Sequence, residues 1–298
     1  MSILGIDRIT YGVEDLERCR RFFLDWGLVA VRETADAVDF ESLNGCEVQL
    51  RRADDSTLPP AIEPGSTLRE VVWGVAAQND LDRVVGALGS DRTTDPNGLS
   101  LAFRVSRKRP IDAAGVVMNA WGRPGRGTNQ RSTFYERATP VEVGHVVLFT
   151  DRLSEVERFY VERLGFHVSD RYPGRGVFLR CAAEGGHHDL FLLQPPVAKR
   201  GLNHVAFTVR DIHEVFGGGL HISRCGWETE LGPGRHPISS AYFWYVKNPA
   251  GGLAEYYTDE DQLDGTWQPK DYEPAPELFA EWAIAGGIDG RTRRQHKP

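Results

Sequence analysis

Apolar and polar residues alternate along several short segments of the chain, as they do in half-buried β-strands. Two of these segments, residues 5–29 and 142–168, continue into a turn with acidic residues and then an amphipathic helical pattern. In each segment a glycine follows the helical pattern (Gly27 and Gly165), in the position at which many helices end. The two segments therefore predict the same strand–turn–helix unit, repeated.

A second and weaker pair of similar segments lies at residues 68–88 and 202–220. Short strand-like runs lie between the units, at residues 36–43, 176–182, 188–194, 241–246 and 252–258. The simplest arrangement is four βαβββ modules, two in each half of the chain. We therefore predict an α+β fold of two domains, each built around a curved mixed sheet.

A change in composition separates the two pairs of modules. Residues 121–140 are polar, rich in Gly and Arg, and without periodicity. The last part of the chain contains one short helical pattern, PELFAEWAIAGG (276–287), and is expected to pack on the body or on a neighbouring subunit. The predicted parts are an N-terminal two-module domain, a C-terminal two-module domain and a tail, at residues 1–125, 139–264 and 265–298.

Composition and charge argue against several classes of protein. The 298 residues are 41% hydrophobic and 26% charged, as in soluble globular proteins. The 35 basic and 42 acidic side chains give a net charge of −7, which argues against general binding of nucleic acid. No apolar run is long enough to span a bilayer, and MSILGIDRIT at the start lacks the pattern of a secretion signal. The four scattered cysteines suggest neither a zinc cluster nor a disulfide scaffold, so we expect a cytoplasmic protein without membrane partners.

Histidine is confined to the second half of the chain. His145 and His204 lie in the middle of the first predicted strand of the third and fourth modules, where the first two modules have Arg8 and Glu70. If the last two modules are related by a pseudo-twofold axis, both imidazoles point into one shared cavity. One half is therefore expected to carry the chemistry and the other to support it. All nine histidines follow residue 144, at positions 145, 167, 187, 188, 204, 213, 221, 236 and 296.

A third polar residue lies in a late strand of the same half. Glu255 stands in an apolar, aromatic run, where a lone carboxylate is costly to bury unless it is paired or bound to a metal. Taken singly, His145, His204 and Glu255 could each be structural, as core histidines and an edge carboxylate that faces water. Their matching positions favour a metal site instead. Two imidazoles and one carboxylate suit non-haem Fe(II) and leave coordination positions open, with Mn(II) as the main alternative.

His145, His204 and Glu255 on repeated modules resemble the metal triad of the type I extradiol ring-cleaving dioxygenases, such as the catechol and dihydroxybiphenyl dioxygenases of the vicinal oxygen chelate superfamily. The resemblance covers most of the chain, since that family has a degenerate N-terminal domain and a metal-bearing C-terminal one. It implies the glyoxalase/bleomycin-resistance/dihydroxybiphenyl-dioxygenase fold. It also implies extradiol cleavage of a catechol-type aromatic diol by O2, in the catabolism of aromatic compounds. We further expect a homo-oligomer.

Three more residues match the pattern of that family. His188 precedes a predicted strand, where the family has a histidine that assists oxygen activation and proton transfer; the adjacent His187 is the competitor for this role. His236, Tyr245 and Glu255 follow one another at the spacing of the family signature. By this resemblance Tyr245 hydrogen-bonds a metal-bound oxygen of the substrate, and His236 contacts the same region.

Two other functions stay open at this point. A lyase or epimerase of the same superfamily would also use His and Glu ligands, but such enzymes commonly add a fourth protein ligand and do not require His188, His236 and Tyr245. A protein that sequesters an aromatic drug would usually be a shorter, two-module chain. The four modules and the additional polar residues favour the dioxygenase.

Overall fold

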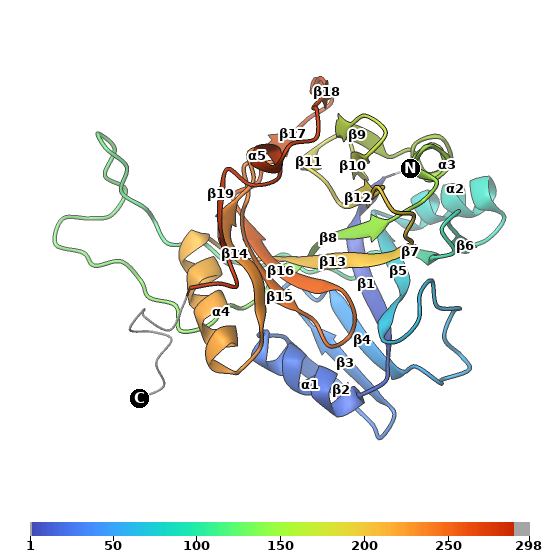
Figure 1. Ribbon diagram of the computed structural model, residues 1–298, viewed down its shortest axis with the longest axis horizontal. Coiled ribbons are helices and arrows are strands. Elements are labelled where there is room, and N and C mark those ends of the chain that lie inside the picture. Colours follow the sequence, from blue (N-terminus) through green and yellow to red (C-terminus); the bar gives the residue numbers. More distant parts are fainter. Residues whose placement is uncertain (1, 289–298) are drawn as a thin grey trace.

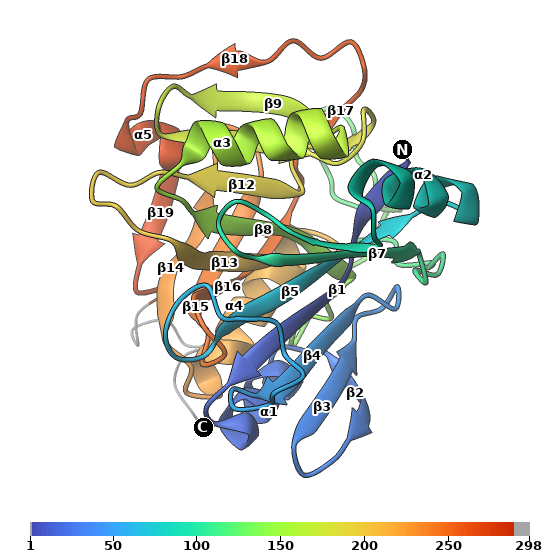
Figure 2. The same ribbon diagram turned by 90° about the vertical axis from the view of Figure 1, so that its right-hand side faces the viewer.

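The computed structural model describes residues 2–288, and two large sheets form its centre (Figures 1 and 2). The first sheet has seven strands in the order β2-β3-β4-β1-β5-β7-β6. Helices α1 (Leu16–Asp25) and α2 (Gln78–Leu88) belong to this half. Its strands are β1 (Ile3–Val13), β2 (Val29–Glu33), β3 (Ala37–Glu41), β4 (Glu47–Arg52), β5 (Thr67–Val75), β6 (Arg92–Thr94) and β7 (Ser100–Val105).

The second sheet has ten strands in the order β18-β9-β10-β12-β8-β13-β16-β15-β14-β19, and β11 pairs separately with β17. Its helical segments are α3 (Leu153–Arg158), which continues as the π-helical turn η1 (Phe159–Arg163), then α4 (Ile212–Arg224) and α5 (Pro276–Phe279). Its strands are β8 (Glu142–Phe149), β9 (His167–Tyr172), β10 (Gly176–Arg180), β11 (Gly185–Gly186), β12 (Leu190–Leu193), β13 (Gly201–Thr208), β14 (Thr229–Arg235), β15 (Tyr242–Lys247), β16 (Leu253–Thr258), β17 (Gln262–Leu263), β18 (Lys270–Asp271) and β19 (Trp282–Ala285).

The strand order confirms the predicted α+β fold and its internal repeat. The order β2-β3-β4-β1 in the first half is matched by β9-β10-β12-β8 in the second, and each half continues across an antiparallel pair, β1 with β5 and β8 with β13. The second module differs from the prediction at one point. Only two strands, β6 and β7, follow α2, whereas β14, β15 and β16 follow α4. The first sheet is therefore shorter at this end.

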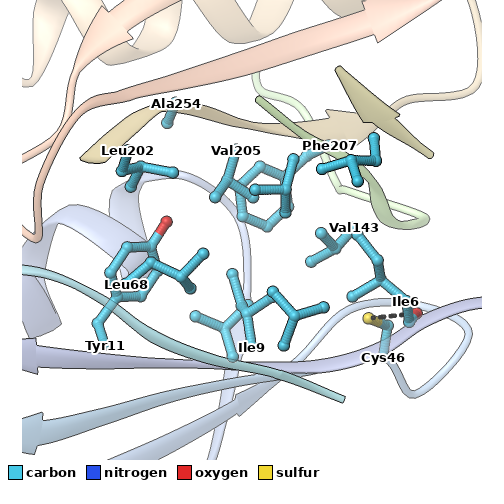
Figure 3. Packing of buried hydrophobic residues seen from close by; sticks show 14 of the residues in the cluster. Ile6, Ile9, Tyr11, Cys46, Leu68, Val143, Leu202, Val205, Phe207 and Ala254 are labelled. Carbon is cyan, nitrogen blue, oxygen red and sulfur yellow. Dashed lines mark hydrogen bonds between the residues drawn. The ribbon is translucent and has the colours of Figure 1, made fainter. Parts of the chain in front are cut away.

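One hydrophobic cluster joins the two halves. Figure 3 shows Ile9, Tyr11 and Leu68 of the first half facing Val205 and Phe207 of the second. Because alternate residues of a strand face opposite sides, these side chains leave the other face of each sheet for polar groups. The two sheets thus share their apolar faces, and the second sheet keeps its polar face for a site.

Helix α1 strengthens the contact between the halves. The Asp15 carboxylate caps its first turn by accepting a hydrogen bond from the Arg18 amide (2.9 Å). Gly27 ends it with a positive φ of 99°, and a Cβ there would lie 2.3 Å from the carbonyl oxygen of Ala138. The Trp26 ring stacks on Tyr256 with 3.6 Å between the ring centroids, and the Tyr256 hydroxyl donates to the Trp26 carbonyl oxygen (2.6 Å).

The tail crosses from one edge of the second sheet to the other. Strand β18 pairs with β9 at one edge, and β19 pairs with β14 at the opposite edge (Figure 2). The helix predicted for residues 276–287 is wrong beyond Phe279, because Trp282–Ala285 is a strand. The unpaired backbone groups of β14 favour the extended form there, and a pattern of three turns is too short to oppose them. The rest of the tail, residues 289–298, lies outside the described residues.

Residues 106–141 connect the sheets without regular strands or helices, apart from one isolated bridge between Ala120 and Arg123. In Figure 1 this segment (green) extends away from the two sheets. Across residues 2–288, none of the helices has both the length and the apolar character needed to cross a membrane.

The hydrogen bond from the Tyr256 hydroxyl to the Trp26 carbonyl oxygen should contribute measurably to the stability of the contact between the halves. Tyr256→Phe removes the donor to the Trp26 carbonyl oxygen but keeps the ring. We expect the free energy of unfolding to fall by about 1–2 kcal/mol, because a buried carbonyl loses its hydrogen bond. Urea unfolding measures this change. The matched control is Tyr242→Phe, at a half-buried tyrosine of β15; equal losses in the two variants would contradict the assignment.

Candidate metal centre

Three neighbouring strands carry the predicted ligands on one face of the second sheet. Strand β8 carries His145, β13 carries His204 and β16 carries Glu255. In the register of the sheet, Ala206 of β13 lies opposite both His145 and Glu255, and His204 is two residues before it. Residues directly opposite one another, and residues two apart on one strand, share a face. The register therefore brings the three side chains together.

The ligand atoms lie at the separations that a shared metal ion requires. His145 Nε2 is 3.3 Å from His204 Nε2 and 3.2 Å from Glu255 Oε2, and His204 Nε2 is 3.1 Å from the same carboxylate oxygen. Ligands about 2.1 Å from a metal and at right angles to one another lie about 3 Å apart. His145 and Glu255 are 4% and 1% exposed. The donor set and its spacing fit a mononuclear metal ion.

Asn203 holds one of the imidazoles in the form that binds a metal. Its amide oxygen lies 2.7 Å from His204 Nδ1, so Nδ1 carries the proton and Nε2 presents its lone pair. His145 Nδ1 is buried and has no hydrogen-bond partner among the described residues. The sequence analysis did not assign a role to Asn203. The feature of the sequence that could have revealed it is a polar side chain next to a histidine in an otherwise apolar strand.

The charge states of the triad also suit metal binding. Burial alone would raise the pKa of Glu255, but the imidazoles of His145, His204 and His236 hold that pKa well below its usual range. Burial lowers the pKa of His145. The site therefore offers an ionised carboxylate at Glu255 and a neutral imidazole at His145, which are the forms that coordinate a metal.

His236 and Tyr245 lie beside the triad as a hydrogen-bonded pair. The backbone carbonyl of Phe279, in the tail, lies 2.6 Å from His236 Nδ1, so this nitrogen carries the proton. His236 Nε2 then accepts from the Tyr245 hydroxyl at 3.0 Å, and it lies 3.8 Å from Glu255 Oε1. Burial, together with the charge of Glu255, raises the pKa of Tyr245 well above its usual value. Tyr245 thus keeps its proton and stays a hydrogen-bond donor.

The two adjacent histidines before β12 point to different surroundings. The His188 ring packs against that of His145, with 4.1 Å between the centroids, whereas His187 Nε2 lies 2.9 Å from a carboxylate oxygen of Asp170. The two rings face each other through their Nδ1 atoms, 3.2 Å apart. Burial lowers the pKa of His188 well below its usual value, so its imidazole is neutral. His188 is therefore beside the triad and His187 is behind it.

The first sheet carries an ion pair where the second carries the triad. Arg8 and Glu70 occupy the register positions of His145 and His204, and Ala102 occupies that of Glu255. The Arg8 guanidinium lies 3.0 Å from Glu70, which Arg92 also contacts. The buried Glu70 carboxylate is thus neutralised by arginine.

Glu260 is a half-buried acid near the site, and the sequence analysis missed it. Its carboxyl accepts hydrogen bonds from the Tyr257 hydroxyl (3.1 Å) and from the backbone amide of His187 (3.0 Å). The Tyr257 ring in turn packs on His145. Burial, reinforced by repulsion from Asp189, raises the pKa of Glu260 to about 8. No signal in the sequence separated Glu260 from the other acidic residues of residues 259–264, because its burial depends on strands that are distant along the chain.

The raised pKa of Glu260 predicts how stability depends on pH. A glutamate in the unfolded chain ionises near pH 4.5, whereas folded Glu260 keeps its proton up to pH 8. The folded protein should therefore lose stability as the pH rises from about 5 to 8, on the order of 3 kcal/mol, and the loss should level off above pH 8. In Glu260→Gln this part of the slope should vanish in urea unfolding at pH 5, 6.5 and 8. The control is Glu184→Gln, at an exposed position, which should keep the slope of the unmodified protein. If the free energy of unfolding changed with pH equally in the unmodified protein, Glu260→Gln and Glu184→Gln, the prediction would be refuted.

Comparisons with known proteins agree with this geometry. Residues 142–256 match the model of the Glyoxalase/Bleomycin resistance protein/Dioxygenase superfamily. The chain is 33% identical over 192 residues to metapyrocatechase 2 of Cupriavidus necator, an alignment that covers 63% of this chain and 58% of that relative. It is 21% identical over 238 residues to the manganese-dependent 2,3-dihydroxybiphenyl 1,2-dioxygenase of Geobacillus genomosp. 3, covering 72% and 74% of the two chains.

A solved structure, the Mn(II)-bound glyoxalase from Novosphingobium aromaticivorans, superposes with a TM-score of 0.75 at 25% identity, covering 96% of this chain and 93% of that one. This similarity extends over both sheets. The family model starts at β8 and ends in β16, so it spans the three strands that carry the triad and the strands and helices between them. The repeated fold, the match to the family model and the named relatives lead to one conclusion: residues 142–256 form a domain of the Glyoxalase/Bleomycin resistance protein/Dioxygenase superfamily.

Proposed function

We propose that this chain is an extradiol dioxygenase, which cleaves the ring of a catechol-type aromatic diol with O2 at a mononuclear metal centre. The observation that carries the proposal is the buried His145–His204–Glu255 triad with two further sets of polar groups beside it: the His236–Tyr245 pair and His188. The relatives named metapyrocatechase 2 and 2,3-dihydroxybiphenyl 1,2-dioxygenase support the same activity.

His145 Nε2, His204 Nε2 and Glu255 Oε2 would hold the ion, which is Fe(II) or, as in the name of one relative, manganese. When bound, the ion lowers the cost of ionising the diol and offers adjacent positions to the diol and to O2. The protein contributes a carboxylate that neutralises part of the metal's charge, and Asn203 keeps the His204 lone pair aimed at the ion.

Tyr245 and His236 would orient the diol. The Phe279 carbonyl fixes the proton of His236 on Nδ1, so Nε2 acts as an acceptor and Tyr245 keeps its hydrogen for donation. A hydroxyl that stays protonated can hydrogen-bond to an anionic oxygen of the substrate, and such a group stabilises negative charge in the low dielectric of a buried site. With a diol bound, the Tyr245 hydroxyl would turn from His236 Nε2 to the substrate oxygen, and Nε2 would then be free to accept a hydrogen bond from a substrate hydroxyl close to it.

His188 would act as the acid and base. Its Nδ1 faces His187, so its Nε2 is the nitrogen available to a substrate. A neutral imidazole can take a proton from the diol and return it to the product, and groups of this kind typically contribute about 100-fold to 10,000-fold to the rate.

His187 would position His188 rather than replace it. The Asp170 carboxylate can only accept, so the proton of His187 lies on Nε2 and its Nδ1 is an acceptor. His188 must then donate from its own Nδ1, which leaves its Nε2 without a proton. Asp170 and His187 therefore select the form of His188 that can act as a base.

The rival functions fit the described residues less well. In a glyoxalase-like lyase or epimerase a fourth protein ligand is common, but the cluster at this place contains three ligand groups within residues 2–288. A drug-binding protein needs no ionised carboxylate that is buried among imidazoles, because such a group is costly unless it holds a cation. A cytoplasmic, homo-oligomeric enzyme without nucleic-acid partners stays our prediction.

Oxygen uptake with a panel of catechols tests the proposed activity. Protein purified without oxygen and loaded with Fe(II) or Mn(II) should bind about one ion per chain and consume O2 with a coloured ring-opened product. His204→Ala should lose the ion and lower the rate at least 1,000-fold, since a facial triad cannot hold its metal with two ligands. The matched control is the exposed His213→Ala, which should keep both. Stoichiometric metal without O2 uptake on any catechol would favour the lyase or epimerase.

Asp170→Asn tests the positioning of His188. An asparagine can donate to His187, which reverses the direction of the hydrogen bonds and leaves a proton on His188 Nε2. We expect kcat to fall about 10-fold to 100-fold with unchanged metal content and an unchanged KM for the diol. His167→Gln, an exposed histidine on the same strand as Asp170, is the control. A normal kcat in Asp170→Asn, with His188→Ala inactive, would refute the role of Asp170 and leave that of His188 intact.

A further inference from the structure

A second group of metal-binding side chains lies where α1 and α4 meet, at the contact between the two halves (Figure 1). Asp25 is the last residue of α1, His221 lies in the last turn of α4, and Cys225 directly follows α4. One ligand atom from each residue lies within 4.8 Å of the other two. The three residues are half-buried, so an ion can enter from solvent.

The separation of the sulfur and nitrogen atoms matches a tetrahedral zinc site. His221 and Cys225 are four residues apart, which places them on one side of a helical turn, and His221 Nε2 lies 3.5 Å from Cys225 Sγ. Zinc binds sulfur at about 2.3 Å and imidazole nitrogen at about 2.0–2.1 Å, and at a tetrahedral angle these ligands lie about 3.5 Å apart. An ion can therefore bind between the two atoms without moving the helix.

Asp25 supplies the third ligand from the other half of the chain. The Trp227 indole donates to one of its carboxylate oxygens, Oδ2, at 2.8 Å and so orients the carboxylate. Arg21 also lies 3.7 Å from Oδ2, and its positive charge opposes a cation. A thiolate and a carboxylate together neutralise a divalent ion, however, so Arg21 faces a group without net charge.

We propose that Asp25, His221 and Cys225 bind Zn²⁺, with a solvent molecule as the fourth ligand, and that the ion links the two halves of the fold. The site differs in chemistry from the triad, because it contains a thiolate. Soft sulfur ligands select zinc, whereas a site of imidazoles and a carboxylate also accepts iron or manganese. An ion that binds only the folded state stabilises it. The proposal does not depend on the proposed activity.

Co²⁺ in place of Zn²⁺ gives a direct test. A thiolate bound to Co²⁺ produces a charge-transfer absorption that the sulfur-free triad cannot produce. We expect this band to saturate at one equivalent in His204→Ala, where the triad lacks a ligand, and by two equivalents in the full chain, where the triad also binds Co²⁺. The band should be absent in Cys225→Ser, and in His221→Ala the binding of Co²⁺ should be weakened at least 100-fold. Addition of Zn²⁺ should abolish the band by displacement.

Thermal unfolding provides the second measurement. Zn²⁺ should raise the unfolding midpoint of His204→Ala, in which the triad is disabled, but should leave the midpoint unchanged when Cys225→Ser or Asp25→Asn is added to His204→Ala. A cobalt band that persists in Cys225→Ser would place the ion on another cysteine and overturn the proposal. A band that appears only at millimolar Co²⁺, without a shift of the midpoint by Zn²⁺, would mean adventitious binding and overturn it equally.

Discussion

The register of β8, β13 and β16 is the constraint on which the rest of the site depends. Ala206 faces both His145 and Glu255, and His204 lies two residues along the same strand. A slip of one residue would move each ligand to the apolar face that packs against the first half. The pairing is held from that face, where Val205 and Phe207 belong to the cluster shared by both sheets (Figure 3). The hydrophobic contact between the halves thus fixes the proposed metal centre, although this contact lies on the opposite side of the sheet.

The internal repeat shows two solutions to the same physical problem. A polar residue in the middle of a central strand must be compensated, because burial of an unpaired charge is costly. The second half gathers three such groups and leaves their lone pairs aimed at one point, which requires a cation. The first half places Arg8 at the matching position, and its guanidinium supplies the positive charge to Glu70 directly. One backbone arrangement therefore gives a binding site in one half and a permanent ion pair in the other.

Much of this could be predicted from the sequence, since the strand periodicity and the repeat locate His145, His204 and Glu255 at matching positions. The contacts that complete the site come from segments whose positions depend on tertiary pairing. The Phe279 carbonyl reaches His236 because β19 adds to the edge of the sheet at β14, in a region where the local pattern favours a helix. Asp170 reaches His187 from β9, and Asp25 reaches Cys225 across 200 residues of chain. Spacing along the sequence does not contain such information.

The neighbouring histidines 187 and 188 show why the sequence left their roles open. Two identical side chains at adjacent positions differ only in direction, and direction follows from what surrounds the backbone. Asp170 lies on one side and the His145 ring on the other, so each imidazole meets a different partner. The carboxylate can only accept, and this one restriction sets the proton of His187 and, through it, that of His188. The buried Asp170 is thus linked to His188 through the His187 ring, without contact to the proposed metal ligands.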